Sequence, residues 1–492
     1  MISEFKKVHA GPRWKIRFGS FEGVERKAVI ELQRMIQYYS PYVVEIREGG
    51  EDNGPVGHEA LIGTPTSNPG IGELIASGRM EAPCGPEGYC LLMRAVPERP
   101  DLRQLVVAGA DERGVLYGAL EASLHLFNGG TLLDGPAGAG LRCRLDEAEP
   151  FAIREAPAIP HRGLWTWGYP ITNHRRYLDQ MMRLKLNTLT LWNDHVPLNI
   201  ADILDEAHGR GIRVILGFHL GWGHKGSLDL SSAGDRRRIR VAALETYRAQ
   251  YAGLAHDGIY FQTLTEHGEL MLAGRSTATW AARLMNETAA ALWAEFGDVP
   301  IQLGLHATSI REHYGDLSEL DRRIEVVWED CAAQIPYSYY PGQEVPVTDT
   351  PEVSLGYSRE LAALRPGQAF GIVAKGWTCI RWKDDFENHG PFLLGEQSGQ
   401  RTRERLLLRQ NEWDRINAHW LEHYPSAAWF YREMLKTNPA LAVYGLVEDG
   451  MLEERVQPSV ALFAETLWNP RQDDAVLLRR ALRPAYQRLF PL

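Results

Sequence analysis

The stretch His256-Asp-Gly-Ile-Tyr-Phe-Gln-Thr-Leu-Thr-Glu266 decides how the rest of the chain is interpreted. Its middle, Gly258 to Gln262, is a mostly apolar run that predicts a short buried strand. The run is followed by Thr263, Thr265 and Glu266. A carboxylate in such a place is costly to desolvate unless it is paired or takes part in chemistry. Taken alone, Glu266 would also fit a residue that caps the next turn or ends the strand in solvent.

The same pattern, an expected buried strand that ends in polar or aromatic residues, recurs along the chain from His161 onward. The strands alternate with helical stretches, which predicts βαβ units and a parallel sheet. Strands are expected at 162–168, 188–194, 213–219, 258–266, 301–307, 324–330, 370–377 and 442–448. Helices are expected at 175–186, 200–209, 237–255, 277–296 and 404–424.

Eight such units favour an α/β protein built as a (β/α)8 TIM barrel with insertions. The alternative is an open, doubly wound sheet, which usually has a glycine-rich phosphate loop after its first strand. The stretch Trp165-Thr-Trp-Gly-Tyr-Pro170 is no such loop. We therefore expect a barrel at 151–470, a small mixed α/β accessory domain at 1–150 and a helical tail at 471–492. Residues 134–140, rich in Gly, Pro and Ala, are expected to link the two domains.

The accessory domain is expected to start with an edge strand at 14–18, followed by a helix at 24–38. Its last motif is Gly109-Ala-Asp-Glu-Arg-Gly-Val-Leu-Tyr-Gly-Ala-Leu120, in which Asp111 is the expected N-cap of a helix. This motif resembles the end of the accessory domain in α-glucuronidases of the glycoside hydrolase 67 type and in β-N-acetylhexosaminidases. The shared pattern consists of Gly109, Asp111, Arg113, Gly114, Tyr117 and Gly118. The resemblance implies a domain that supports the barrel and carries no chemistry.

Composition excludes several classes of partner. The chain has 492 residues and a formal net charge of −10, which argues against nucleic acid or an anionic membrane as its main partner. Five scattered Cys without C-x-x-C spacing fit reduced thiols, with no zinc site and no other cofactor expected. The N-terminus lacks the apolar segment of a signal peptide, so a cytoplasmic location is expected, although a trimmed start would hide such a segment. The sequence leaves the oligomeric state open.

The carboxyl ends of the expected strands carry acids, cations, amides and many of the 14 Trp residues. In a barrel these ends converge on one face, where active sites are built. A Trp ring offers a flat apolar face with a polar handle, which suits a sugar ring. The expected carbohydrate-binding residues are Trp165, Trp167, Trp192, Asn193, His219, Trp222, Gln262, His306, Trp328, Lys375, Trp377 and Arg381.

Structural roles are the alternative for individual members of this set. Trp192 and Trp328 could face the helices as core residues, and His306 could be a satisfied core histidine. Glu329 and Asp330 could be a loop charge pair. Taken together these alternatives are weaker, because the polar or aromatic residues at the carboxyl end of every expected strand would each need a separate structural role.

Carboxylates, Trp and His at one face without a phosphate loop indicate glycoside hydrolysis. One protonated carboxyl must give a proton to the leaving oxygen, and a second carboxylate must act on the other face of the sugar. Glu266 is the candidate acid, and Glu329 or Asp330 is the candidate second carboxylate. Because strands four and six are not neighbours, a wide gap and hence inversion of the anomeric centre are favoured.

A uronic acid is the first substrate expected, because Lys375, Arg381, His219 and His306 could meet its carboxylate or its hydroxyls. The α-glucuronidases resemble this arrangement by position, with an acid Glu after strand four. An N-acetylhexosamine is the second possibility, but those enzymes place an Asp before the acid Glu, and here the residue is Thr265. A carbohydrate-binding barrel without chemistry is the third. The segment 377–424 is expected to form a lid or a subsite wall.

Overall fold

The computed structural model describes residues 12–40, 42–49, 57–97, 99–128, 145, 148–221, 229–262, 270–305, 310, 312–329, 351–377, 390–447 and 451–483. The chain divides into two compact units. The first consists of Met1–Pro157, His208–Gly211 and Arg483–Leu492, and the second of Ala158–Ala207 and Ile212–Leu482. The expected linker at 134–140 lies outside the described residues.

The first unit contains one six-stranded sheet in the order β2-β1-β3-β5-β4-β6. Its strands are β1 (Trp14–Phe18), β2 (Glu45–Glu48), β3 (His58–Gly63), β4 (Tyr89–Val96), β5 (Arg99–Gly109) and β6 (Phe151–Glu155), and its helices are α2 (Gly23–Tyr39), α3 (Pro69–Ala76) and α4 (Glu112–Asn128). The expectation that 14–18 is an edge strand is wrong. The strand β1 pairs on one side with β2 and on the other with β3, and its residues Trp14 and Ile16 are buried.

The Gly109–Leu120 motif joins β5 to α4. The prediction that Asp111 caps the helix is confirmed, because its Oδ1 accepts a hydrogen bond of 2.8 Å from the Gly114 amide. Its Oδ2 accepts a second bond of 2.8 Å from the Glu87 amide. A Cβ atom on Gly114 would overlap with the carbonyl of Gly88, so the glycine allows the helix to approach the preceding turn. The motif therefore has a packing role in this unit.

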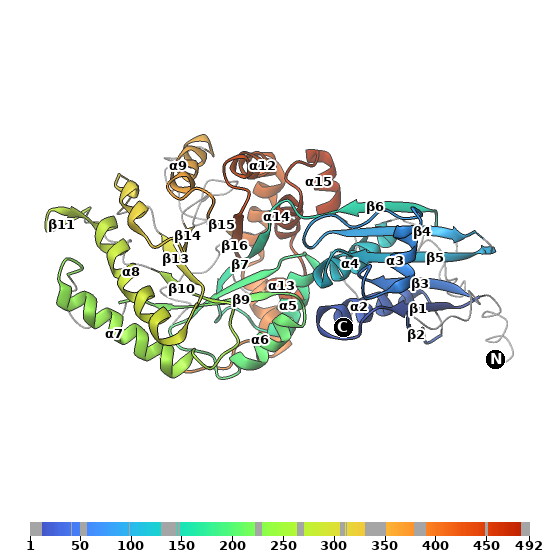
Figure 1. The fold of residues 1–492 in the computed structure, drawn as a ribbon, viewed down its shortest axis with the longest axis horizontal. Coiled ribbons are helices and arrows are strands. Elements are labelled where there is room, and N and C mark those ends of the chain that lie inside the picture. Colours follow the sequence, from blue (N-terminus) through green and yellow to red (C-terminus); the bar gives the residue numbers. More distant parts are fainter. Residues whose placement is uncertain are drawn as a thin grey trace. The chain divides into compact units, whose positions relative to one another are not determined.

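The second unit is a closed barrel of eight parallel strands, in the order β10-β13-β14-β15-β16-β7-β8-β9 (Figure 1). The predicted (β/α)8 fold is confirmed. In chain order the strands are β7 (His161–Trp167), β8 (Thr188–Trp192), β9 (Arg213–His219), β10 (Gly258–Gln262), β13 (Ile301–Leu305), β14 (Ile324–Trp328), β15 (Phe370–Trp377) and β16 (Leu441–Val447). β7 ends one residue and β8 two residues before the end expected from sequence, whereas β9 ends as expected. The expected ends of β10, β13, β14 and β16 lie outside the described residues.

Helices surround the barrel strands. They are α5 (His174–Arg183), α6 (Ile200–His208), α7 (Ala233–Gln250), α8 (Thr277–Phe296), α9 (Pro351–Ala363), α11 (Gly399–Leu408), α12 (Gln410–Thr437), α13 (Met451–Glu454), α14 (Pro458–Trp468) and α15 (Asp474–Ala481). A short strand pair, β11 (Met271–Leu272) and β12 (Arg275–Ser276), and a 3-10 helix, η2 (Tyr314–Glu319), complete the described elements.

The long helix α12 forms part of the segment that follows β15. Its residues Trp413 and Trp420 are fully buried, and the Trp420 ring stacks on Trp377 with centroids 4.3 Å apart. Part of the segment expected to be a lid or subsite wall is therefore a packed barrel helix. Residues 378–389 of that segment lie outside the described residues.

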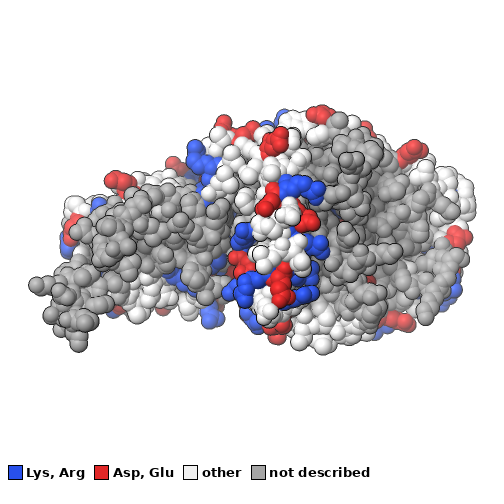
Figure 2. All heavy atoms as spheres, turned by 180° about the vertical axis from the view of Figure 1, so that it is seen from behind, with Lys and Arg blue, Asp and Glu red and all other residues white. Residues whose placement is uncertain are grey.

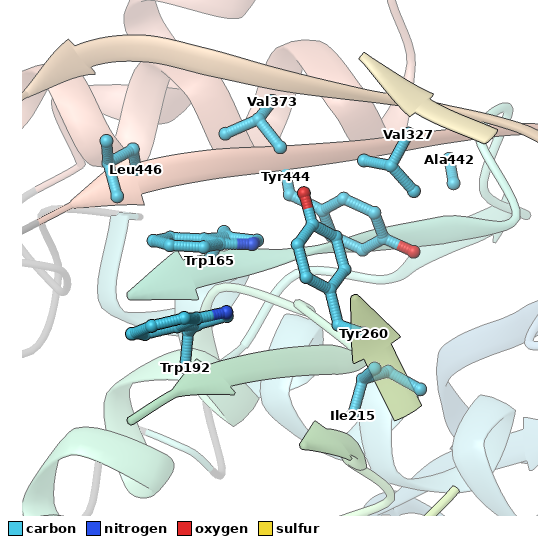
Figure 3. Close-up of a cluster of buried hydrophobic side chains, with 9 residues drawn as sticks. All are labelled: Trp165, Trp192, Ile215, Tyr260, Val327, Val373, Ala442, Tyr444 and Leu446. Carbon is cyan, nitrogen blue, oxygen red and sulfur yellow. The ribbon is translucent and has the colours of Figure 1, made fainter. Parts of the chain in front are cut away.

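Side chains from alternate residues of each strand fill the barrel interior, as the two-residue period of a strand requires. One buried cluster in the interior combines four large rings with smaller aliphatic groups (Figure 3). It consists of Trp165, Trp192, Ile215, Tyr260, Val327, Val373, Ala442, Tyr444 and Leu446. Because these residues mark the inward face of every barrel strand except β13, they also show which neighbouring residues point inward at the strand ends.

Acidic and basic side chains are interspersed over the face shown in Figure 2. Among the described residues of the second unit, Arg175 pairs with Glu396 at 3.2 Å and Arg176 with Glu454 at 3.7 Å. Exposed pairs of this kind contribute little to stability. On the described residues of this face, the net charge of −10 is thus not gathered into one acidic patch.

Candidate active site

Glu329 is the central residue of the candidate site. It directly follows β14, and its amide donates a 3.0 Å hydrogen bond to the Leu305 carbonyl, which continues the pairing with β13. The side chain lies two residues after the inward-facing Val327 and therefore points into the barrel. Only 3% of Glu329 is exposed. A carboxyl group this deeply buried needs partners.

Two other strands, β10 and the adjacent β15, supply those partners. The Tyr260 hydroxyl of β10 donates a short hydrogen bond to Oε1 of Glu329. The Gln262 amide, on the same strand, donates a 3.1 Å bond to Oε2, and the Lys375 ammonium of β15 lies 4.0 Å from Oε2. Two hydrogen-bond donors and a cation stabilise a carboxylate more than a carboxylic acid. The arrangement therefore favours an ionised Glu329.

Tyr260 is suited to act only as a donor in this arrangement. Burial in the barrel raises the pKa of its phenol well above the ordinary value of 10, and the neighbouring charge of Glu329 raises that pKa further. The phenol consequently stays protonated through the neutral range. Its ring also contacts Trp165 edge-on, with centroids 5.9 Å apart, which fixes where the hydroxyl lies.

The contact between Tyr260 and Glu329 depends on a glycine. Gly304 belongs to β13, which lies between β10 and β14 in the ring. A Cβ atom built on Gly304 would overlap with both the Tyr260 hydroxyl and Oε1 of Glu329. The missing side chain is therefore what allows the two groups to meet across the strand between them.

Three of the expected tryptophans line one side of the same interior. Trp165 and Trp167 come from β7 and contact each other nearly at right angles, with centroids 5.6 Å apart. Trp167 also contacts Trp192 of β8 at 4.4 Å. Trp165 and Trp192 are buried, and Trp167 is the partly exposed member of the three. The first two therefore hold Trp167, which keeps part of its ring exposed.

Unsatisfied donors accompany these rings. Among the described residues, no protein group accepts a hydrogen bond from Trp192 Nε1 or from the buried amide nitrogen of Asn193. Buried polar groups are usually hydrogen-bonded, so such donors mark a place where a polar ligand would gain bonds. Both follow or end β8, at the same end of the barrel as Trp167.

His219 ends β9 and faces inward, two residues after Gly217. Burial lowers its pKa below the ordinary value of 6.5, while the charge of Asp194 partly opposes this effect. The imidazole is therefore neutral at pH 7. It can exchange hydrogen bonds with sugar hydroxyls, and its expected contact with a uronate carboxylate stays a prediction.

Two expected sugar-binding tryptophans lie elsewhere. Trp328 faces the helices, where its ring meets Tyr357 of α9 with centroids 4.7 Å apart. The pairing of β15 with β16 is irregular between Ala374 and Trp377, so Lys375 points inward while Trp377 packs outward on Trp420 and Phe463. The structure thus does not bring Trp328 or Trp377 to Glu329. For Trp328, the helix-facing alternative considered from the sequence describes its position.

Several predicted site residues lie outside the described residues, and their roles stay predictions. They are Thr263, Thr265, Glu266, Trp222, His306, Asp330 and Arg381. Of the predicted catalytic carboxylates, the structure describes Glu329.

Tyr260 and Gly304 are the site residues that were not identified from the sequence. Tyr260 precedes Gln262 by two residues, so the alternation of the strand could have placed it on the same inward face. Nothing in the sequence indicates that Gly304 makes room for a contact between two other strands.

The described residues contain no group of three or more His, Cys, Asp and Glu side chains able to hold a metal ion. Within the same part of the chain, no helix combines the length and the apolar character needed to span a membrane.

Comparison with known proteins identifies the fold. No protein-family model matches the chain, and no curated protein matches it. A solved structure of a GH138 enzyme targeting pectin rhamnogalacturonan II is similar over 94% of this chain and 51% of its own, with 12% identity and a TM-score of 0.51. A family GH115 4-O-methyl-alpha-glucuronidase with specificity for decorated arabinogalactans is similar over 96% of this chain and 59% of its own, with 15% identity and a TM-score of 0.52.

The chain thus spans little more than half the length of these two structures. At such low identity the similarity shows a shared fold, a barrel together with a preceding domain. The closer resemblance to family 67 α-glucuronidases or β-N-acetylhexosaminidases that the sequence implies stays a prediction.

Proposed function

We propose that this chain is a glycoside hydrolase in which Glu329 is the carboxylate that acts as base or nucleophile. The observation that carries the proposal is a buried Glu329 held by two donors and a cation at the carboxyl end of the barrel strands. That end is where barrel enzymes place their active sites. A carboxylate kept ionised cannot supply the proton that the leaving oxygen needs, so it takes the second role in glycoside hydrolysis.

Trp167 supports a sugar as the ligand. Its partly exposed ring is held by Trp165 and Trp192, and the donors on Trp192 and Asn193 have no protein partner among the described residues. A flat apolar surface beside polar donors matches the two kinds of surface on a sugar ring. The two similar structures, both named as carbohydrate-active enzymes of glycoside hydrolase families, agree with this ligand class.

Glu266 is proposed as the general acid, on the sequence argument alone. It follows β10, and β13 separates β10 from β14, so the two carboxyl groups would come from strands that are not adjacent. A separation of about 6.5–9.5 Å between the two carboxyl groups leaves room for a water molecule and gives inversion. We therefore propose inversion, which proton NMR of the first-formed anomer would test.

A terminal uronic acid is the substrate class that we propose first. Lys375 is an inward-facing cation beside Glu329 and could share its charge with a sugar carboxylate. One of the two similar structures is named as a 4-O-methyl-alpha-glucuronidase. An N-acetylhexosamine is the weaker candidate, because Thr265 stands where those enzymes have an Asp.

Hydrolysis of a panel of oligosaccharides tests the proposal. The panel should contain substrates ending in a uronic acid, an N-acetylhexosamine and a neutral hexose, each without an activated leaving group. Release of the uronic acid is the expected result. Binding of these sugars without turnover of any of them would contradict hydrolysis and favour a carbohydrate-binding barrel instead.

A further inference from the structure

The Tyr260 hydroxyl occupies a special position relative to Glu329. It belongs to β10, whereas Glu329 follows β14, and the hydrogen bond between them passes over Gly304 of the intervening strand. Tyr260 is completely buried, so its hydroxyl is shielded from bulk water. The position of Glu329 therefore depends on a residue that itself lies below the ends of the strands.

The other groups that face Glu329 can be named element by element. On β10 it meets Tyr260 and Gln262, and on β15 it meets the Lys375 ammonium. On β13 the facing residue is Gly304, which carries no charge. Lys375 is the charged group among these described neighbours, and at 4.0 Å it approaches Oε2 rather than Oε1. Loss of the Tyr260 hydroxyl would thus leave Oε1 without its donor from β10.

We propose that Tyr260 is a positioning residue, which holds Glu329 in one orientation and in the ionised state that the reaction requires. Tyr260 would act through Glu329 and need not touch the sugar. This inference rests on the proposed function and extends it, because it says how the barrel keeps a buried carboxylate ready to react. Gly304 is required for the same contact, since any larger residue would separate the Tyr260 hydroxyl from the Glu329 carboxylate.

Tyr444 provides a matched control. It is also a completely interior tyrosine of the barrel cluster, and its hydroxyl accepts a 3.2 Å hydrogen bond from Gln302. Tyr444→Phe removes a buried hydroxyl from the same interior without removing a donor from Glu329. A purely structural effect of losing a buried hydroxyl would therefore appear in both variants.

The experiment measures kcat/KM against pH for the wild type and for Tyr260→Phe, Tyr444→Phe, Gly304→Ala and Glu329→Gln. A hydrogen bond to a charged group is worth enough to move an ionisation by about 1–2 pH units. Tyr260→Phe should therefore move the acidic limb of the profile upward by about 1–2 units and lower the activity at neutral pH. Gly304→Ala should move the limb in the same direction, and Tyr444→Phe should leave it in place. Thermal melting shows which variants are folded.

The outcomes separate the two proposals. Full turnover in Glu329→Gln would overturn the proposed function, and the positioning role with it. Loss of turnover in Glu329→Gln together with an unmoved acidic limb in folded Tyr260→Phe would overturn the positioning role alone. An equal shift in Tyr444→Phe would overturn it as well. If Tyr260→Phe does not fold, the direction of the shift in Gly304→Ala decides.

Discussion

Two clusters of the same three residue types lie at opposite ends of the barrel interior. The carboxyl-end cluster consists of Glu329, Gln262 and Tyr260, and the amino-end cluster consists of Glu325, Gln302 and Tyr444. Glu325 lies near the start of β14, and Glu329, four residues later, directly follows the end of that strand. The clusters differ in how their members are connected.

In the carboxyl-end cluster, the tyrosine and the glutamine both donate to the glutamate, and Lys375 lies nearby. In the amino-end cluster, Gln302 donates to Glu325 at 2.9 Å and to Tyr444 at 3.2 Å, so the tyrosine does not reach the carboxyl group. Oε1 of Glu325 has no hydrogen-bond partner among the described residues.

This difference in connection has a consequence for protonation. Burial raises the pKa of Glu325, and the bond from Gln302 only partly opposes that effect. Glu329 has donors on both oxygens, which favours the charged form. The same residue types thus accompany a carboxyl group with a raised pKa at one end of the barrel and an arrangement that favours the ionised form at the other. The hydrogen-bond pattern, rather than the residue types, therefore distinguishes the amino-end cluster from the cluster that we propose to be reactive.

The largest expected effect is the difference in turnover between a variant that lacks the Glu329 carboxyl group and a variant that lacks the Glu325 carboxyl group. Glu329→Gln should lower turnover by roughly 10²–10⁴-fold, the usual contribution of a general base, while keeping the shape of the side chain. Glu325→Gln, on the same strand, should leave turnover within about two-fold of the wild type, because this residue belongs to the amino-end cluster. Steady-state kinetics on an unactivated oligosaccharide measures both. Equal losses in the two variants would remove the distinction between the clusters.

Glu453 is another buried carboxyl group, and its hydrogen-bond donors contact one of its two oxygens only. Oε1 of Glu453 accepts bonds of 2.7 Å and 3.3 Å from the Thr172 amide and hydroxyl, whereas Oε2 has no partner among the described residues. Burial raises the pKa of Glu453 from 4.5 to about 7. The folded state therefore binds this proton more tightly than the unfolded state does.

The stabilising contribution of this proton is complete below pH 4.5 and is lost as the pH rises to about 7. The difference in unfolding free energy between the wild type and Glu453→Gln should accordingly fall by about 2.5 kcal/mol between pH 5 and pH 8. Chemical denaturation at several pH values measures it. A difference that is independent of pH would show that Glu453 titrates normally.

The smallest expected effect is seen in two Gly→Ala variants, which distinguish a loss of stability caused by overpacking from a loss of catalytic activity. A Cβ atom on Gly371 would lie 2.7 Å from the Val327 side chain, so both Gly371→Ala and Gly304→Ala crowd the barrel interior. Overpacking of this kind costs about 1–3 kcal/mol of stability in each variant. Only Gly304→Ala should also lower the activity per folded molecule, because only Gly304 lies between Tyr260 and Glu329. A matching loss of specific activity in Gly371→Ala would reduce the role of Gly304 to packing.

The fold was largely predictable because its signals are local. Each barrel strand is a short apolar run, and the polar residue after each run is visible in the sequence, which is how Glu329 was identified. The position of β1 was not predictable in this way, because whether a strand is central or at an edge depends on partners far away in the chain.

The site was predictable only in part, because its geometry depends on which way each strand faces. Trp328 and Glu329 are adjacent and their side chains turn to opposite faces, so only Glu329 enters the candidate site. The irregular pairing around Lys375 sends Trp377 outward, and no sequence period predicts such a shift. The role of Gly304 depends on two other strands and appears only in three dimensions.

The most direct test of the central claim is a crystal structure of Glu329→Gln with an uncleaved oligosaccharide that ends in a uronic acid. We predict that the sugar lies against Trp167 at the carboxyl ends of the strands, with one water molecule between its anomeric carbon and residue 329. Direct contact at about 3–3.5 Å would keep Glu329 as a reacting group but make it a nucleophile. A sugar bound with its anomeric carbon far from residue 329 would contradict the account.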